Sequence, residues 1–459
     1  MEPGRAHRIS LGLSALPFVV AVSSLFAALF LFQLPIYCAL LAGWLTALVI
    51  ANRHGFSLRS LLAASYRGMT STSIVVIILL LIGGLIAVWM ASGTVAGLIV
   101  YGIQLVVPQY LVVTAFLLAF MMSMLLGTSV GTLSTMGIAL ASMAQAIGIP
   151  SGLIGGALIS GAMVGDRTSP LSGTLHLLAA TVGMKSDETF RSIVRSGTPV
   201  FFICLLLYAW LGYQAVDPHT SVQGGAEAVR KLSSVFQLPW WVLIPPALVM
   251  LLVACRVPIR INLALGIVLG AVLACTVQGR SLQEIASIAW NGFSIKAPDG
   301  SVLLEGGGVW HMMHVVSIIL TAGALNGILE MSGMMDRLIG GVLEPIKRQG
   351  SLLVATGLIS IAAGLIFCNQ TLMVLIPGRM LQAKYRELGE PPVRLATALA
   401  DSGVVAAVLI PWNLHSILCA TAIGIAATTY WPYAFFVWML PLLTIAKGAL
   451  RLTSREETD

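Results

Sequence analysis

Apolar residues occur along this chain in long runs that are separated by short polar segments. A helix that crosses a lipid bilayer needs about 20 apolar residues, and ten runs approach or exceed that length. They cover roughly 11–31, 35–51, 73–91, 152–184, 198–213, 237–255, 261–277, 309–331, 393–425 and 430–446. The pattern predicts an all-α polytopic membrane protein.

Four apolar stretches depart from a simple span. The runs 152–184 and 393–425 are too long for one crossing and carry polar interruptions, so we expect each to be a broken helix. The stretches 110–148 and 351–384 each turn in the middle, which predicts two re-entrant hairpins. Non-helical backbone at membrane depth is tolerated only where protein or a water-filled cavity satisfies it, so such breaks point to a functional site.

Composition supports the membrane assignment. The chain has 459 residues, of which 58% are hydrophobic and 9% charged, whereas a soluble domain carries about 25% charged residues. Lipid is therefore the expected surroundings of most of the chain. The net charge of +7 does not indicate a nucleic-acid partner, because the basic residues sort to one side of the predicted membrane.

The distribution of lysine and arginine predicts the orientation. With the N-terminus in the cytoplasm, 19 of the 25 basic residues fall in cytoplasmic segments, and Arg167 and Arg379 fall within membrane elements. The opposite side receives Arg230, Lys231, Arg280 and Lys296. The first run exceeds a signal-peptide core of about 7–15 residues, so we expect it to be retained. These patterns predict a multi-pass protein of the cytoplasmic (inner) membrane with both termini inside.

A weak internal repeat divides the chain. Residues 83–99 (GGLIAVWMASGTVAGLI) resemble residues 323–339 (GALNGILEMSGMMDRLI), an offset near 240. We expect a first repeat at 1–213, an extracytoplasmic linker at 214–236, a second repeat at 237–446 and a cytoplasmic tail at 447–459. Each repeat has five spans plus one hairpin. Since five is odd, the repeats must be inverted, an architecture that many secondary transporters share.

Four polar breaks carry the candidate binding residues. The middle of each predicted hairpin and the break of each long helix place hydroxyl, carboxamide or carboxylate groups at membrane depth. These residues are Thr128, Ser129 and Thr132; Asp166, Thr168, Ser169 and Ser172; Asn369 and Gln370; and Asp401, Ser402 and Asn413.

Two acids dominate this set. Asp166 and Asp401 each precede a proline-containing break, and we expect them to occupy corresponding places in the two repeats. A central aspartate costs about 2.5–3.5 kcal/mol on insertion scales, so such residues usually mark an ion or proton path. We predict Na⁺ binding at Ser129, Asp166, Asn369 and Asp401, with proton uptake when Na⁺ leaves. The alternative for Asp166 is a structural pair with neighbouring Arg167, and the small-residue breaks alternatively serve helix packing.

Other polar residues give weaker signals. Glu330, His176 and His415 are candidates for a proton path, although each is also compatible with a structural role. His311 and His314 have helical metal-ligand spacing without a third ligand nearby, so no metal centre is predicted. No nucleophile–base set, cofactor motif or nucleotide-binding loop is present, which argues against an enzyme or a nucleotide-driven pump, and the clustering of polar residues at breaks argues against a channel pore.

Four ordered motifs, GTSVGTLSTMGIAL, GALISGAMVGDRTSPLS, LIPGRML and LADSGVVAAVLIPWN, resemble the NhaC-type sodium/proton antiporters of the ion-transporter superfamily. The likeness extends from the segment near Trp89 over most of the chain. It implies a scaffold domain, a transport domain that moves like an elevator, and a homodimer. The family includes sodium/proton antiporters and relatives that exchange organic solutes.

Two positions depart from the family pattern. Gly173 follows Ser172 where the family has an acid, and Asn369 stands where the second hairpin usually carries an aspartate. Both changes remove a carboxylate from the expected site. The sequence therefore predicts a secondary transporter whose coupling ions are Na⁺ and H⁺, with sodium/proton antiport as the first hypothesis and ion-coupled transport of a small organic acid or amino acid as the second.

Overall fold

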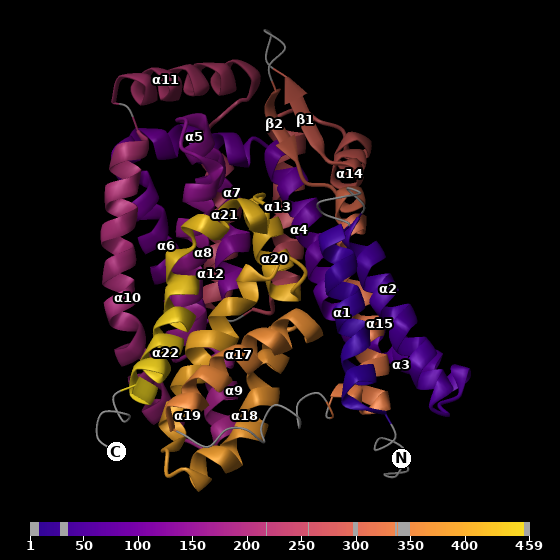
Figure 1. Cartoon of the computed structure of the whole chain (residues 1–459). Coiled ribbons are helices and arrows are strands. Elements are labelled where there is room, and N and C mark those ends of the chain that lie inside the picture. Colours follow the sequence, from indigo (N-terminus) through magenta and orange to yellow (C-terminus); the bar gives the residue numbers. More distant parts are fainter. Residues whose placement is uncertain are drawn as a thin grey trace.

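The computed structural model describes residues 9–27, 35–216, 218–255, 257–296, 302–335, 337 and 349–453. These residues form a bundle of helices with one small sheet (Figure 1). The predicted helical membrane fold is observed, with the sheet as an addition.

The first part of the chain forms helices that follow the predicted runs and breaks. They are α1 (Leu11–Ala27), α2 (Ile36–Arg53), α3 (Leu58–Ser71), α4 (Ser73–Ala91), α5 (Thr94–Leu105), η3 (Pro108–Tyr110), α6 (Leu111–Leu126), α7 (Ser129–Ala146), α8 (Ser151–Thr168), α9 (Gly173–Val182) and α10 (Ser186–Ala215).

The second part begins with a helix inside the predicted linker. Its elements are α11 (Pro218–Val235), η4 (Trp240–Leu243), α12 (Ile244–Ala254), α13 (Ile259–Thr276), α14 (Leu282–Asn291), β1 (Phe293–Lys296), β2 (Val302–Gly306), α15 (Val309–Ser332), α17 (Gln349–Phe367), α18 (Gln370–Glu387), α19 (Pro392–Leu399), η5 (Ala400–Val404), η6 (Val405–Leu409), α20 (Leu414–Ile423), α21 (Ala427–Tyr430), η7 (Trp431–Tyr433) and α22 (Phe435–Thr453).

The sheet is the feature that the apolar pattern did not predict. Strands β1 and β2 pair in antiparallel register, with Phe293 opposite Gly306. They are only 4 and 5 residues long, too short for an alternating pattern to stand out between two membrane spans. The strictly all-α prediction therefore needs this correction.

Fewer helices satisfy a strict span criterion than the ten predicted runs. Seven helices in the described residues are long and apolar enough to cross a membrane, or up to nine if two bent pairs each count as one span. The runs 11–31, 35–51 and 430–446 form shorter apolar helices, and both first arms of the predicted hairpins, Pro108–Leu126 and Gln349–Phe367, meet the criterion. The chain is therefore a multi-pass membrane protein.

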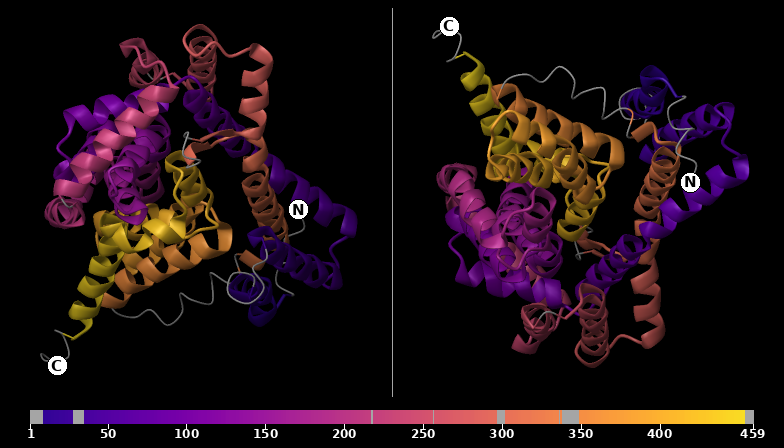
Figure 2. Two further views of the ribbon diagram at one scale, coloured as in Figure 1. Left: turned by 90° about the horizontal axis from the view of Figure 1, so that it is seen from above. Right: turned by 90° about the horizontal axis from the view of Figure 1, so that it is seen from below.

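The helices separate into two groups, visible from above and below in Figure 2. In one group, α15 contacts α2, α3 and α4, α1 packs on α2, and α4 packs on α13. In the other, α6 packs on α8, α17 on α22, and α7 on α20, while α9 and α10 contact α18 and α19 respectively. Figure 1 places α11 and the sheet at one end of the molecule, and the start of α1 with the end of α22 at the other.

Close packing of α6 on α8 fixes the position of the C-terminal end of α8. Gly161 and Gly165 face α6, and a Cβ atom added at Gly165 would lie 2.5 Å from the Cβ of Ser123. The hydroxyl of Ser123 donates to the carbonyl of Ala162 at 2.6 Å. The absence of side chains on these glycines therefore lets the two backbones approach and holds the last turn of α8 in place.

Candidate functional site

The polar breaks predicted from the sequence are the places where four helices begin. Each of these helices, α7, α9, α18 and α20, starts after a residue whose side chain accepts a backbone N–H of the first turn. These N-cap residues are Thr128, Ser172, Asn369 and Asn413. Threonine, serine and asparagine are preferred at this position because they satisfy N–H groups that lack a helical partner.

Contacts bring these helix starts together. The N–H of Leu414 donates to the carbonyl of Cys368 at 2.9 Å, which joins the start of α20 to the turn before α18. A Cβ atom on Gly127, in the turn before α7, would lie 2.6 Å from the carbonyl carbon of Leu171 in the α8–α9 break. The positive ends of several helix dipoles therefore point into one region, which favours negative charge there.

Asp166 supplies that negative charge. It lies near the C-terminal end of α8 and is 4% exposed. One carboxylate oxygen accepts from the backbone N–H of Ser129 at 3.4 Å, and the other accepts from Nε2 of Gln370 at 3.1 Å. The starts of α7 and α18, one from each predicted hairpin, thus hold the carboxylate through neutral donors.

His415 completes this cluster. Its Nε2 lies 2.8 Å from the hydroxyl oxygen of Ser129 and 3.9 Å from a carboxylate oxygen of Asp166. Of the three residues predicted for a proton path, His415 is therefore the one that contacts Asp166. Gln370 also donates to the carbonyl of Val404 at 3.0 Å, so its amide bridges Asp166 and the last residue of η5.

Asp401 has a different set of partners. Arg167 donates a hydrogen bond to its carboxylate, and both side chains are buried. Ser196 and Thr444 donate to the two carboxylate oxygens at 3.1 and 3.0 Å. Arg167 also donates to the carbonyl of Ile193 at 3.0 Å. The alternative that Arg167 pairs with Asp166 is therefore wrong, and the two acids do not share hydrogen-bond partners among the described residues.

The remaining predicted hydroxyls bond mainly to backbone carbonyls. Ser172 donates to the carbonyl of Asp166 at 2.5 Å, which ties the α8–α9 break to the central acid. Three others bond to the carbonyl one helical turn earlier: Thr132 donates to Thr128, Thr168 to Val164 and Ser402 to Ala398. Ser169 donates to the carbonyl of Met124 and so ties the end of α8 to α6. These residues shape the breaks, and the side-chain cluster around the carboxylate consists of Ser129, Gln370 and His415.

Two predicted proton-path residues lie elsewhere. His176 is exposed, and its Nδ1 lies 2.9 Å from the hydroxyl oxygen of Ser186. Glu330 is exposed near the end of α15. Sequence reasoning missed Ser196 and Thr444, which sit in long apolar helices. The signal available was Arg167 itself, because a buried guanidinium requires acceptors.

Several helix boundaries recur at one fixed spacing along the chain. Four pairs of helix-boundary residues lie 241 positions apart: Thr128 and Asn369, Pro150 and Pro391, Ser172 and Asn413, and Gly183 and Gly424. The turns match as well, since Gly127 and Cys368 both have positive φ, 67° and 53°.

This spacing corrects one expectation about the acids. At a spacing of 241 positions, Asp166 falls opposite Ala407, and Asp401 falls opposite Ser160. The two aspartates therefore do not occupy corresponding places. At this spacing neither aspartate has an acid as its counterpart, and the two have different hydrogen-bond partners.

Comparisons with known proteins show which family the chain resembles along its length. The sequence model of the Na⁺/H⁺ antiporter family matches residues 6–195 and 161–450. The Na⁺/H⁺ antiporter NhaC of Alkalihalophilus pseudofirmus is 30% identical over 96% of both chains. The malate-2H⁺/Na⁺-lactate antiporter of Bacillus subtilis is 27% identical, covering 94% of this chain and 93% of its own. The arginine/ornithine antiporter ArcD of Halobacterium salinarum is 28% identical, covering 81% and 78%. The resemblance drawn from the motifs is confirmed.

Proposed function

The chain belongs to the Na⁺/H⁺ antiporter family, and we propose that it exchanges sodium ions for protons across the cytoplasmic membrane. Membership makes it a secondary transporter and not an enzyme. Relatives in the family include both Na⁺/H⁺ antiporters and antiporters named for organic acids or amino acids. Family membership therefore does not identify the transported species, and the proposal concerns that species.

The environment of Asp166 supports the proposal. The carboxylate is buried, and its partners are the N–H of Ser129, the amide of Gln370 and the imidazole of His415. Within the described residues no lysine or arginine pairs with it, because Arg167 pairs with Asp401. A buried carboxylate without a fixed counter-ion gains from binding a small cation or a proton.

Exchange follows from this single charge. Na⁺ and H⁺ each neutralise Asp166, so occupancy by one excludes the other. The loaded site is electrically neutral and moves through the membrane more easily than a bare carboxylate. Oxygen ligands for Na⁺ are the Asp166 carboxylate and the hydroxyl of Ser129. We leave Asp401 out of the Na⁺ site because Arg167 neutralises it, and Asn369 because its side-chain oxygen accepts from the N–H of Thr371 at 2.8 Å.

The architecture supports alternating access. We propose that the cap and turn pairs 241 positions apart mark two inverted repeats, with hairpins at α6–α7 and α17–α18. In this proposal the group containing α6–α10 and α17–α22 is the transport domain, and the group containing α1–α4 and α13–α15 is the scaffold (Figure 2). The bias of lysine and arginine supports an orientation with α11 and the sheet outside and both termini in the cytoplasm.

The decisive test is a proton-flux assay in proteoliposomes loaded with a pH-sensitive dye. We expect pulses of Na⁺ or Li⁺ to move protons in the opposite direction, with little response to K⁺ and none in vesicles without protein. Correctly inserted protein that gives no cation-dependent proton flux would contradict sodium/proton antiport.

A second candidate is exchange of a small organic acid or amino acid. It is favoured by the named activities of two relatives and by a cavity of about 800 Å³, far more than a bare ion requires. Uptake of radiolabelled lactate, malate, arginine or ornithine into proteoliposomes preloaded with the same solute distinguishes the two. Solute exchange without Na⁺-driven proton flux would replace the first proposal.

A further inference from the structure

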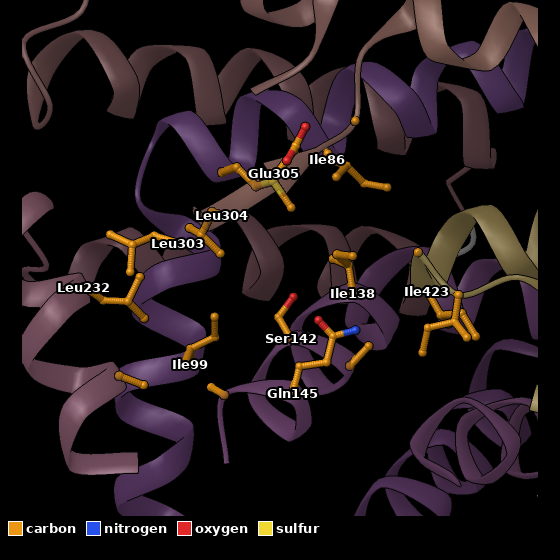
Figure 3. A pocket seen from close by; sticks show the side chains of 18 of the residues that line it. Ile86, Ile99, Ile138, Ser142, Gln145, Leu232, Leu303, Leu304, Glu305 and Ile423 are labelled. Carbon is orange, nitrogen blue, oxygen red and sulfur yellow. The ribbon is translucent and has the colours of Figure 1, made fainter. Parts of the chain in front are cut away.

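A large cavity opens beside the transport-domain helices. It has a volume of about 800 Å³ and is lined on one side by the C-terminal halves of α7 and α20. The opposite wall comes from α4, α5, α11 and β2 (Figure 3). The cavity therefore lies between the two groups of helices, at the end of the molecule that carries α11 and the sheet.

The polar lining of this cavity carries an excess of negative charge. Ser142 and Gln145, one turn apart on α7, point into it (Figure 3). Glu227 and Lys231 on α11 form an ion pair at 3.0 Å and largely cancel. Glu305 on β2 is exposed, and it forms no ion pair with any residue that the structure describes. A cavity with low-dielectric walls and one net negative charge attracts cations.

Two helices connect this cavity with Asp166. Helix α7 starts at Ser129, which contacts Asp166, and its residues from Ile138 onward line the cavity. Nine residues of α-helix span about 13 Å. Helix α20 starts beside His415, and its residues from Ala420 onward line the cavity. Both helices therefore run from the acid toward the cavity.

The wall between cavity and acid is closed by tight packing of α7 on α20. A Cβ atom added at Gly137 would lie 2.7 Å from Cγ2 of Ile423, and one added at Gly424 would lie 3.0 Å from Cδ1 of Ile138. Ile138 and Ile423 face the cavity in Figure 3. Cys419 is fully buried on α20, one helical turn from His415 on one side and from Ile423 on the other.

We propose that this cavity is the vestibule from which the transported cation reaches Asp166 on the side of α11 and the sheet. The packing of Ile423 against Gly137 closes it in this conformation, and Glu305 concentrates cations in it. The inference rests on the proposed function in two respects, namely that the cargo is a cation and that α11 and the sheet lie on the outer side.

Thiol labelling tests the vestibule independently of transport. In a full-length background whose six cysteines are otherwise replaced, one protein carries Gln145→Cys and another retains only Cys419. A membrane-impermeant methanethiosulfonate reagent is added to either side of oriented vesicles. We expect Gln145→Cys to react from the outer side alone and Cys419 to react at least about tenfold more slowly. Labelling of Gln145→Cys from both sides or from neither would overturn the vestibule.

The closing contact is tested in the Cys419 protein. Ile423→Ala should raise the labelling rate of Cys419 from the outer side by about tenfold or more. The matched control is Leu418→Ala. Leu418 is a buried residue of α20 with a side chain of the same size as that of Ile423, but it does not line the cavity. Equal labelling rates in the two variants would show that Ile423 does not close the vestibule.

The role of Glu305 is tested by transport kinetics. Glu305→Gln should raise the KM for external Na⁺ about two- to five-fold at low ionic strength, because the attraction of one solvent-screened charge for the cation is lost. The kcat should stay unchanged, and the difference should shrink in high salt. Glu284→Gln, an acid on α14 outside the cavity, is the control. An unchanged KM in Glu305→Gln would overturn the charge role.

The labelling and flux experiments together distinguish a failure of the vestibule proposal from a failure of the sodium/proton antiport proposal. Wild-type protein that shows no Na⁺-driven proton flux, while Gln145→Cys labels from one side, would reject sodium/proton antiport and the charge role but leave the vestibule supported. Normal flux without outer labelling of Gln145→Cys would reject the vestibule alone.

Discussion

Arg167 donates a hydrogen bond to Asp401 although its neighbour in the chain is Asp166. The bond joins α8 to η5, which are separated by 234 positions in sequence. Since a guanidinium bonded to one carboxylate neutralises that carboxylate, the pairing leaves Asp166 without a lysine or arginine partner among the residues that the structure describes. The position of the Arg167 guanidinium therefore determines which of the two aspartates is neutralised by an ion pair.

Breaking this ion pair should destabilise the protein. Asp401→Leu leaves the buried guanidinium of Arg167 uncompensated, and removal of one partner of a buried pair costs about 3–5 kcal/mol. We expect a clear fall in the thermal unfolding midpoint of the purified protein in detergent. The double variant Arg167→Met with Asp401→Leu should recover most of the loss, because no buried charge is left alone. A double variant as unstable as Asp401→Leu would contradict this account.

Removing the charge of Asp166 should abolish transport and leave the stability of the protein unchanged. Asp166→Asn keeps an oxygen that accepts from the N–H of Ser129, so we expect wild-type expression and thermal stability. Transport should fall to the background of empty vesicles, because neither Na⁺ nor H⁺ is needed to neutralise an amide. The check is the dye-based proton-flux assay, with Glu284→Gln, an acid-to-amide change on α14 away from the site, as the control. Wild-type flux in Asp166→Asn would remove Asp166 from the transport site.

The sequence predicts the positions of the breaks well. Glycine turns, N-cap residues and prolines are local signals, and they place the starts of α7, α9, α18 and α20 where the polar motifs stand. The sequence also places Ser129 and Asp166 in one predicted Na⁺ site, and the N–H of Ser129 donates to Asp166; the bond from Gln370 to Asp166 was not predicted. Local sequence patterns were sufficient to predict a helix start or a turn wherever a single residue type determines it.

The pairing of the acids could not be predicted in the same way. A sequence shows that Arg167 is adjacent to Asp166, but side chains of consecutive helical residues point in different directions. The choice of Asp401 depends on how α8 packs against η5, α10 and α22, and on the hydroxyls of Ser196 and Thr444. Such contacts are fixed by tertiary packing between distant segments, which apolar periodicity does not encode.

His415 should matter for transport far more than His176. The imidazole of His415 contacts both Ser129 and Asp166, whereas His176 is exposed beside Ser186. A group that transfers protons typically contributes on the order of 10²–10⁴-fold to a rate. We expect His415→Gln to lower Na⁺-driven proton flux by at least about tenfold and His176→Gln to leave it near wild type. Equal rates in the two variants would exclude His415 from the proton path.

Gly165 should be intolerant of any side chain. Its Cα faces the α6 backbone, and an added Cβ would collide with Ser123 and Met124. Gly165→Val should therefore push α8 away from α6, at a cost of roughly 1–3 kcal/mol or more, seen as a lower unfolding midpoint and loss of flux. Gly173→Ala is the matched control, because a Cβ at Gly173 meets nothing within 4 Å. A Gly165→Val protein as stable as this control would disprove the packing argument.

The two departures from the family pattern can be reversed without disturbing the fold. Gly173 is the first residue of α9, where a side chain has open space and an acid interacts favourably with the helix dipole. Asn369→Asp retains the oxygen that caps α18. We expect Gly173→Asp with Asn369→Asp to lower the KM for Na⁺ at least about fivefold, since two carboxylates join the region around Asp166. The charge-free pair Gly173→Ser with Asn369→Ser controls for bulk and capping. A KM for Na⁺ that is the same in both double variants would show that these positions do not set ion affinity, and it would direct the search for cargo toward organic solutes.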